Sequence, residues 1–216
     1  MPDPTKTIRD DLPPGPPAAP APVRLGALRR LLNELGPKEK DGRNWGEFIR
    51  RMGAYFLSRS RLQSFAPGQV NEGKLLWCAL TVCGFIYEEL LGRGQTELAS
   101  HWKRIASTEC SKLWRNLDSL GWAWRRGAPL PAALSPQGVD VPGLPAAGDL
   151  VFYGQVKADG SLDFAHVDFY KAPLAGDDFE SAGGNTGHPV ADRVDVVKHR
   201  GPEKLGRVIG YARVPW

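Results

Sequence analysis

The chain has 216 residues, of which 42% are apolar and 24% charged, the composition of a globular protein with room for one sizeable domain. Its 28 Lys and Arg residues against 24 Asp and Glu give a net charge of +4, too diffuse for a nucleic-acid interface but compatible with an anionic polymer. No long apolar run is present, so we expect no membrane span, and the N-terminal segment lacks the apolar stretch of a secretory signal. The 25 glycines and 19 prolines leave little room for an all-helical bundle.

The first 23 residues form a proline-rich leader. Eight of them are proline, set among alanine and glycine, so this stretch has few side chains to bury and few backbone donors for regular hydrogen bonding. We expect a disordered or polyproline-like leader over residues 1–23 and a single domain over residues 24–216.

Hydrophobic residues then recur at helical spacing up to about residue 121. Leu25, Leu28 and Leu31 mark the first helix, which Gly36-Pro37 should end. The third predicted helix, KLLWCALTVCGFIYEELLG, is the most apolar. The four expected helices cover about residues 24–35, 44–60, 74–92 and 96–120.

After a proline-rich loop over about residues 122–147, the hydrophobic period changes to two. The five expected strands lie at 149–154, 163–172, 179–183, 193–197 and 207–214, separated by Gly, Asp or Pro. Helices followed by a run of antiparallel strands predict an α+β fold. The N-terminal helices should pack on a C-terminal antiparallel sheet over about residues 148–216.

The three cysteines, Cys78, Cys83 and Cys110, form neither a disulfide framework nor a paired zinc motif, so we expect free thiols. Cys78 falls near the start of the most apolar helix, where exposed N–H groups stabilise a thiolate and can bind an oxyanion. Cys83 lies about 140° further round the helix and cannot face the same cleft. The structural alternative is that Cys78 is a small core residue.

His166 is the histidine best placed to pair with that cysteine. It lies inside the predicted strand DFAHVDFY, and strand alternation places its side chain on one face with Phe164 and Asp168. A His on a strand facing a Cys-bearing helix is what a nucleophile and its base require, although a partly buried structural His is the alternative. His101 and His199 are expected on the solvated surface.

Asn185, in the turn SAGGNTG, is a candidate third member. A side-chain oxygen that accepts the second imidazole N–H fixes the tautomer and orientation of a catalytic histidine. A plain Gly-Gly-Asn turn is the structural alternative.

Five segments, taken in chain order, resemble the motifs of CHAP and NlpC-type peptidoglycan hydrolases. The similarity extends over about residues 35–216 and preserves the order of the motifs. The segments are the lead-in LGPKEKDGRNWGEFIRRMGAYF (35–56), WCALTV (77–82), PAAGDLVFY (145–153), AHVDFY (165–170), and SAGGNTG followed by RVIGYARVPW.

The resemblance implies a papain-like α+β fold, with a cysteine at a helix N-terminus packed against the sheet that carries the histidine. It implies that Cys78 is the nucleophile, that His166 acts as general base and then acid, and that Asn185 orients the imidazole. No cofactor is implied, and we expect no metal, since Asp159 and Asp163 around a Gly-Ser turn are too few for a calcium site.

The chain departs from the family pattern around the histidine. Ala165 and Asp168 replace the usual glycines, and Gly183 stands where many members carry a Glu. Asp168 is therefore the alternative to Asn185 as the residue that orients the imidazole.

The resemblance also implies the substrate, an amide bond of bacterial peptidoglycan, cut by an amidase or an endopeptidase. Trp77 and Trp102 are candidates for substrate binding, although tryptophans at such spacing often belong to a core. Alternatives are a hydrolase of a non-wall amide and a catalytically silent wall-binding module.

Without a secretory signal, such an enzyme would be made in the cytoplasm and would reach the periplasm or wall by non-classical export or lysis. An antibacterial effector, with an immunity protein or a secretion-system partner, and a phage lysin both fit. No nucleic-acid partner is expected.

Overall fold

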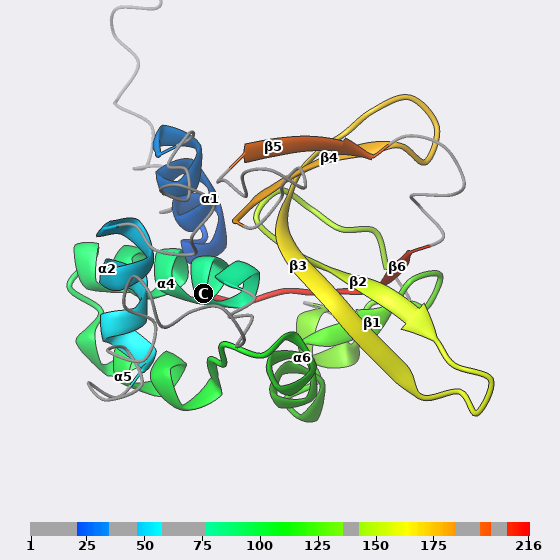
Figure 1. Cartoon of the computed structure of the whole chain (residues 1–216), viewed down its shortest axis with the longest axis horizontal. Helices are drawn as coiled ribbons and strands as arrows, with labels where there is room; N and C mark the ends of the chain where they lie inside the picture. Colours follow the sequence, from blue (N-terminus) through cyan, green and yellow to red (C-terminus); the bar gives the residue numbers. More distant parts are fainter. Residues whose placement is uncertain (1–20, 35–46, 58–76, 136–142, 185–194, 200–206) are drawn as a thin grey trace, which may run out of the picture.

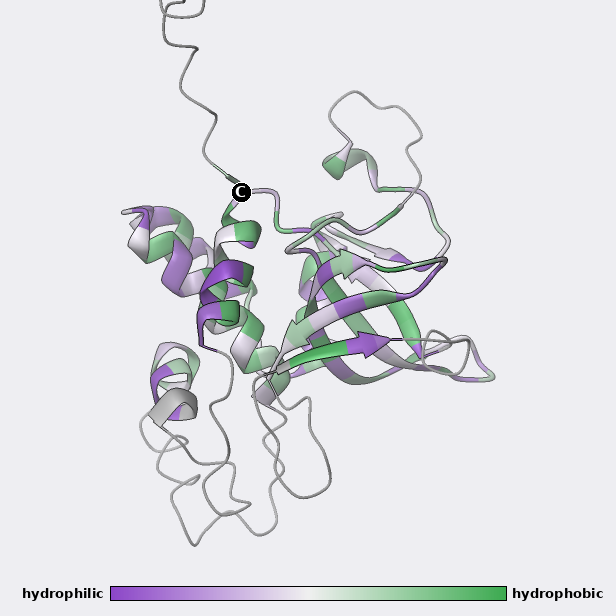
Figure 2. Ribbon diagram, turned by 90° about the horizontal axis from the view of Figure 1, so that it is seen from above, coloured by the Kyte–Doolittle hydropathy of each residue, from purple (hydrophilic) through white to green (hydrophobic). Residues whose placement is uncertain are grey.

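The α+β prediction is confirmed by a computed structural model that describes residues 21–34, 47–57, 77–135, 143–184, 195–199 and 207–216. Within these ranges it contains five α-helices and one six-stranded antiparallel sheet (Figure 1). The predictions for the leader up to residue 20 and for Asn185 fall outside the described residues. Seen from above, most helices stand on one side of the molecule and the strands on the other (Figure 2).

The helices follow the predicted order with one correction. We expected a single helix over residues 96–120, but the backbone leaves the helical region at Ala106, whose ψ is 147°. The Ser107 hydroxyl then accepts a hydrogen bond from the Glu109 N–H, and a new helix begins at Cys110. No helix in the described part of the chain is long and apolar enough to cross a membrane. The helices are α1 (Val23–Asn33), α2 (Glu47–Phe56), α4 (Trp77–Gly92), α5 (Thr96–Ile105) and α6 (Cys110–Ser119).

The sheet has the strand order β1-β6-β2-β3-β4-β5, and every neighbouring pair is antiparallel. Its first strand was missed in the sequence because it is only three residues long and lies in a stretch predicted as a loop. In that strand Trp124 pairs with Tyr211 of the last one. The strands are β1 (Ala123–Arg125), β2 (Leu150–Val156), β3 (Leu162–Pro173), β4 (Phe179–Gly183), β5 (Asp195–His199) and β6 (Val208–Ala212).

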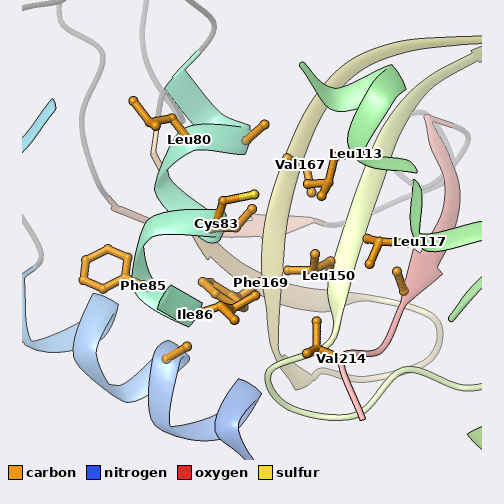
Figure 3. Packing of buried hydrophobic residues seen from close by; sticks show 14 of the residues in the cluster. Leu80, Cys83, Phe85, Ile86, Leu113, Leu117, Leu150, Val167, Phe169 and Val214 are labelled. Carbon is orange, nitrogen blue, oxygen red and sulfur yellow. The ribbon is translucent and has the colours of Figure 1, made fainter. Parts of the chain in front are cut away.

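The central strand β2 is buried on both faces, which explains its continuous apolar run. Leu150 and Phe152 join the core under the helices, whereas Val151 and Tyr153 join a second cluster on the opposite face. Figure 3 shows the main core, in which side chains of α4 and α6 meet those of the sheet.

A buried carboxylate ties the helical layer to the sheet at the turn before β2. Asp149 is fully buried and pairs with Arg213 at 2.7 Å and with Arg24 of α1 at 3.0 Å. The preceding Gly148 has a φ of +87°, and a Cβ there would lie 2.6 Å from the Arg24 carbonyl oxygen. The Gly-Asp pair therefore joins α1 to the start of β2, an inner strand of the sheet.

Candidate active site

Cys78 is the second residue of α4, and its thiol is buried at the end of the helix that faces the sheet. The sulfur takes part in a hydrogen bond with the His166 side chain and accepts one from the Val167 N–H on β3. A second thiol, that of Cys110 at the start of α6, lies 3.5 Å from it. The helix end, the strand and the second helix thus converge on this sulfur.

His166 connects the thiol to a buried carboxylate. Its Nε2 lies 2.7 Å from Oδ1 of Asp168, two residues further along β3. Since Nε2 is engaged by the carboxylate, Nδ1 is the ring nitrogen left to serve Cys78. The Asp168 side chain is only 1% exposed, whereas 21% of the His166 side chain is exposed, so the site is reached from the imidazole side.

The electrostatics of the pair favour its charged form. The hydrogen bond with the Cys110 thiol lowers the pKa of Cys78 well below its usual value, and His166 acts in the same direction against the effect of burial. Burial by itself would lower the pKa of His166, but the Asp168 carboxylate and the Cys78 sulfur outweigh it and raise that pKa well above the usual value. The two shifts act in the same sense and favour a thiolate beside an imidazolium.

The carboxylate that faces His166 comes from β3 because the neighbouring strand leaves room for it. A Cβ on Gly183 of β4 would lie 1.9 Å from Asp168 Oδ1, so any side chain there would displace the carboxylate. Gly183 is the position at which the family resemblance led us to look for a Glu. The acid lies on the adjacent strand instead, and the glycine accommodates it.

The next glycine brings β4 onto the first turn of α4. A Cβ on Gly184 would lie 2.3 Å from Thr81 Oγ1 and 2.4 Å from the Trp77 ring. Thr81 in turn donates to the Trp77 carbonyl at 2.8 Å, so the two groups that Gly184 faces are themselves hydrogen-bonded. The two glycines are needed for close packing and not only for a turn.

Two predictions need correction: that Phe164 shares a face with His166, and that His199 lies on the solvated surface. Phe164 does not share the face of His166, because a bulge separates the pairs Tyr153–His166 and Gly154–Phe164, and the Phe164 ring packs instead on Phe152 under the helices. His199 is not a solvated surface residue. Its Nε2 lies 2.8 Å from Ser181 Oγ.

The other cysteines differ in role. Cys83 points to the Ser107 carbonyl, and burial raises its pKa to about 12, so it is an inert core thiol. Cys110, in contrast, touches Cys78 and was missed as a site residue. With one helix expected over residues 96–120, Cys110 was placed in mid-helix, and only the break at residues 106–109 puts it at a helix start beside the site.

Trp77 and Trp102, predicted to bind substrate, are core residues instead. Their exposed fractions are 1% and 0%, and Trp102 Nε1 donates to the Cys83 carbonyl at 2.9 Å. Neither indole therefore offers a face to a sugar. Across the described ranges, no group of three or more His, Cys, Asp or Glu residues could hold a metal ion.

Comparison with known proteins identifies no relative: no protein-family model, no curated protein and no solved structure matches the chain.

Proposed function

We propose that this protein is a cysteine-dependent amide hydrolase of papain-like fold that cleaves an amide bond in the peptide part of bacterial peptidoglycan. One observation carries the chemistry: the Cys78 thiol hydrogen-bonds His166, whose Nε2 is held 2.7 Å from the buried Asp168 carboxylate. A nucleophile, its base and a group that orients the base are the components required for acyl transfer.

The first half of the reaction forms a thioester. The Cys78 thiolate attacks the amide carbonyl, and the negative charge moves to the carbonyl oxygen. The Cys78 N–H, in the first turn of α4, points out of the helix end together with the positive end of the helix dipole, and it is the proposed oxyanion donor. The His166 imidazolium then protonates the amine as the C–N bond breaks.

The second half releases the acid. Neutral His166 takes a proton from water, and the resulting hydroxide adds to the thioester carbonyl. Collapse of this intermediate breaks the C–S bond, frees the carboxylic acid and restores the thiolate–imidazolium pair. Throughout, Asp168 keeps the imidazole in the tautomer and orientation that present Nδ1 to the sulfur.

The wall as substrate rests on the resemblance of the five segments to peptidoglycan hydrolases. Three of these segments lie at the site. WCALTV opens α4, and AHVDFY supplies His166 and Asp168. SAGG, at the end of β4, packs against both of these segments. The PAAGDLVFY segment supplies the Asp149 turn that joins the two layers.

The test is digestion of purified peptidoglycan by the wild type, Cys78→Ala and Cys83→Ala, with soluble products identified by mass spectrometry. We expect fragments from the wild type and Cys83→Ala and none from Cys78→Ala, and the fragment masses distinguish an amidase from an endopeptidase. A reactive Cys78 without wall fragments would point to another amide substrate. A Cys78 that fails to react with iodoacetamide at neutral pH would point to a silent module.

A further inference from the structure

A chain of hydrogen bonds continues from Asp168 away from the thiol, into the neighbouring strands. Asp168 Oδ2 lies 2.7 Å from the Ser181 hydroxyl on β4, and that hydroxyl lies 2.8 Å from Nε2 of His199 on β5. Tyr153 of β2 completes the group, with its hydroxyl 3.0 Å from the same Nε2. Four adjacent strands thus contribute one side chain each.

The proton on each group follows from counting donors. A carboxylate only accepts, so the single proton of Ser181 points to Asp168. The Ser181 oxygen can then only accept from His199, which requires the proton of His199 to be on Nε2. The Tyr153 hydroxyl oxygen accepts from the same Nε2–H. The hydrogen bonds from His199 to Ser181 and from Ser181 to Asp168 therefore both point toward the carboxylate.

The His199 ring is itself held in place by aromatic stacking. Its centroid lies 4.7 Å from that of Phe179 and 5.0 Å from that of Tyr153, with interplanar angles of 23° and 25°. A ring clamped between two others cannot turn its Nε2 away from Ser181 without losing both contacts.

We propose that Ser181 and His199 are positioning residues for the hydrolysis, holding the Asp168 carboxylate so that Oδ1 faces His166. This inference rests on the proposed function, because it assigns a role in the same reaction. Ser181 is fully buried and lies between His199 and the carboxylate, so both residues act on Asp168 from the side away from the thiol. Among the described residues, the titratable groups that interact with Asp168 are His166, Tyr153 and Cys110, with His199 acting through Ser181.

The test compares Ser181→Ala, His199→Phe and His199→Gln with the wild type. The Phe variant keeps the stacking but removes the donor, and the Gln variant retains an N–H that can reach Ser181. Two readouts are measured on each: the pH profile of Cys78 alkylation by iodoacetamide, and kcat and KM on soluble wall fragments.

We expect Ser181→Ala and His199→Phe to lower the pH above which the thiolate–imidazolium pair is lost because the imidazolium gives up its proton. We also expect them to lower kcat about tenfold with KM unchanged, and His199→Gln to recover part of both effects. Wild-type pH limits in both Ser181→Ala and His199→Phe would overturn the proposal. If instead wild-type Cys78 reacts like an ordinary thiol, the proposed function itself fails, so the two failures are distinguishable.

A second inference rests on a different observation, the 3.5 Å contact between the sulfurs of Cys78 and Cys110. Both thiols are reduced in the structure and lie on the ends of two helices that meet at the site. Closing to a disulfide requires the sulfurs to approach by about 1.5 Å, which small rotations of two side chains can supply.

We infer that Cys110 is a resolving cysteine, which converts the oxidised nucleophile into a reversible disulfide when a peroxide enters the site. The Cys78 thiolate attacks one peroxide oxygen, the O–O bond breaks, and the leaving hydroxide takes the proton of the His166 imidazolium, so that a sulfenic acid and water form. Cys110 loses its proton and attacks that sulfur, forming the S–S bond and releasing a second water. Two thiols thus supply the two electrons that reduce one hydrogen peroxide.

The test treats the full chain with hydrogen peroxide and follows intact mass and Cys78 alkylation. We expect the wild type to lose two hydrogens in mass, to become resistant to iodoacetamide and to recover fully with dithiothreitol. Cys110→Ala should instead gain oxygen atoms and not recover, and Cys83→Ala should behave like the wild type. Equal, irreversible oxidation of the wild type and Cys110→Ala would overturn this inference.

Discussion

Replacing Asp168 by Asn removes the negative charge that faces the His166 imidazole and keeps the shape of the side chain. An opposite charge at this range changes a pKa by about 1–3 units. Each unit is about 1.4 kcal/mol, so the imidazolium loses about 1.4–4 kcal/mol of stabilisation. Because Asp168 is only 1% exposed, solvent screens its charge weakly, so we expect its removal to lower the pKa of His166.

The sign of the effect is the same for both members of the pair. Without the carboxylate, the raised pKa of His166 falls, and the loss of the imidazolium in turn raises the depressed pKa of Cys78. The pH range in which thiolate and imidazolium coexist therefore narrows from both sides. Hydrolysis should lose at least tenfold in kcat at neutral pH.

The assay is the rate of Cys78 alkylation by iodoacetamide across pH, read by peptide mass spectrometry, with hydrolysis measured on the same samples. Asp163→Asn is the matched control, because this carboxylate lies on the same strand, is 63% exposed and has Lys157 only at 3.9 Å. The control should retain the wild-type profile. A folded Asp168→Asn variant with wild-type pH limits would refute the assignment of Asp168 as the group that orients His166.

Three further predictions follow from the described contacts. Gly183→Ala places a Cβ against Asp168 Oδ1, so it should lower hydrolysis as Asp168→Asn does, and full activity would contradict the packing described. In a competition between thiols, Cys78 should be alkylated well below pH 8.5, whereas Cys83, with a pKa of about 12, should stay unlabelled until the protein unfolds. Asp149→Asn leaves Arg24 and Arg213 without their buried carboxylate and should lower the free energy of unfolding, measured by urea titration, by about 3–5 kcal/mol. A loss below about 1 kcal/mol would show that these ion pairs do not hold the two layers together.

Much of the fold could be predicted from the sequence because helices and strands are marked by local periodicity. The strand over residues 179–183 has the predicted bounds, and the most apolar helix does prove to be the buried one, packed between the sheet and the N-terminal helices (Figure 3). Alternation along β3 also placed His166 and Asp168 on one face, where they form a hydrogen bond.

What the sequence could not reveal depends on contacts between distant segments. Cys78 and Cys110 are 32 residues apart in the sequence, and Ser181 and His199 are 18 apart, so no local sequence pattern indicates either contact. The position of the bulge beside Phe164 depends on pairing with β2, which alternation within one strand does not record.

The most direct test of the central claim, that Cys78 hydrolyses a peptide amide of the wall, is digestion of peptidoglycan in water enriched in oxygen-18. Hydrolysis of the thioester places a solvent oxygen in each new carboxylate. The account predicts labelled fragments from the wild type and none from Cys78→Ala. Fragments released equally by Cys78→Ala, or released by the wild type without the label, would contradict it.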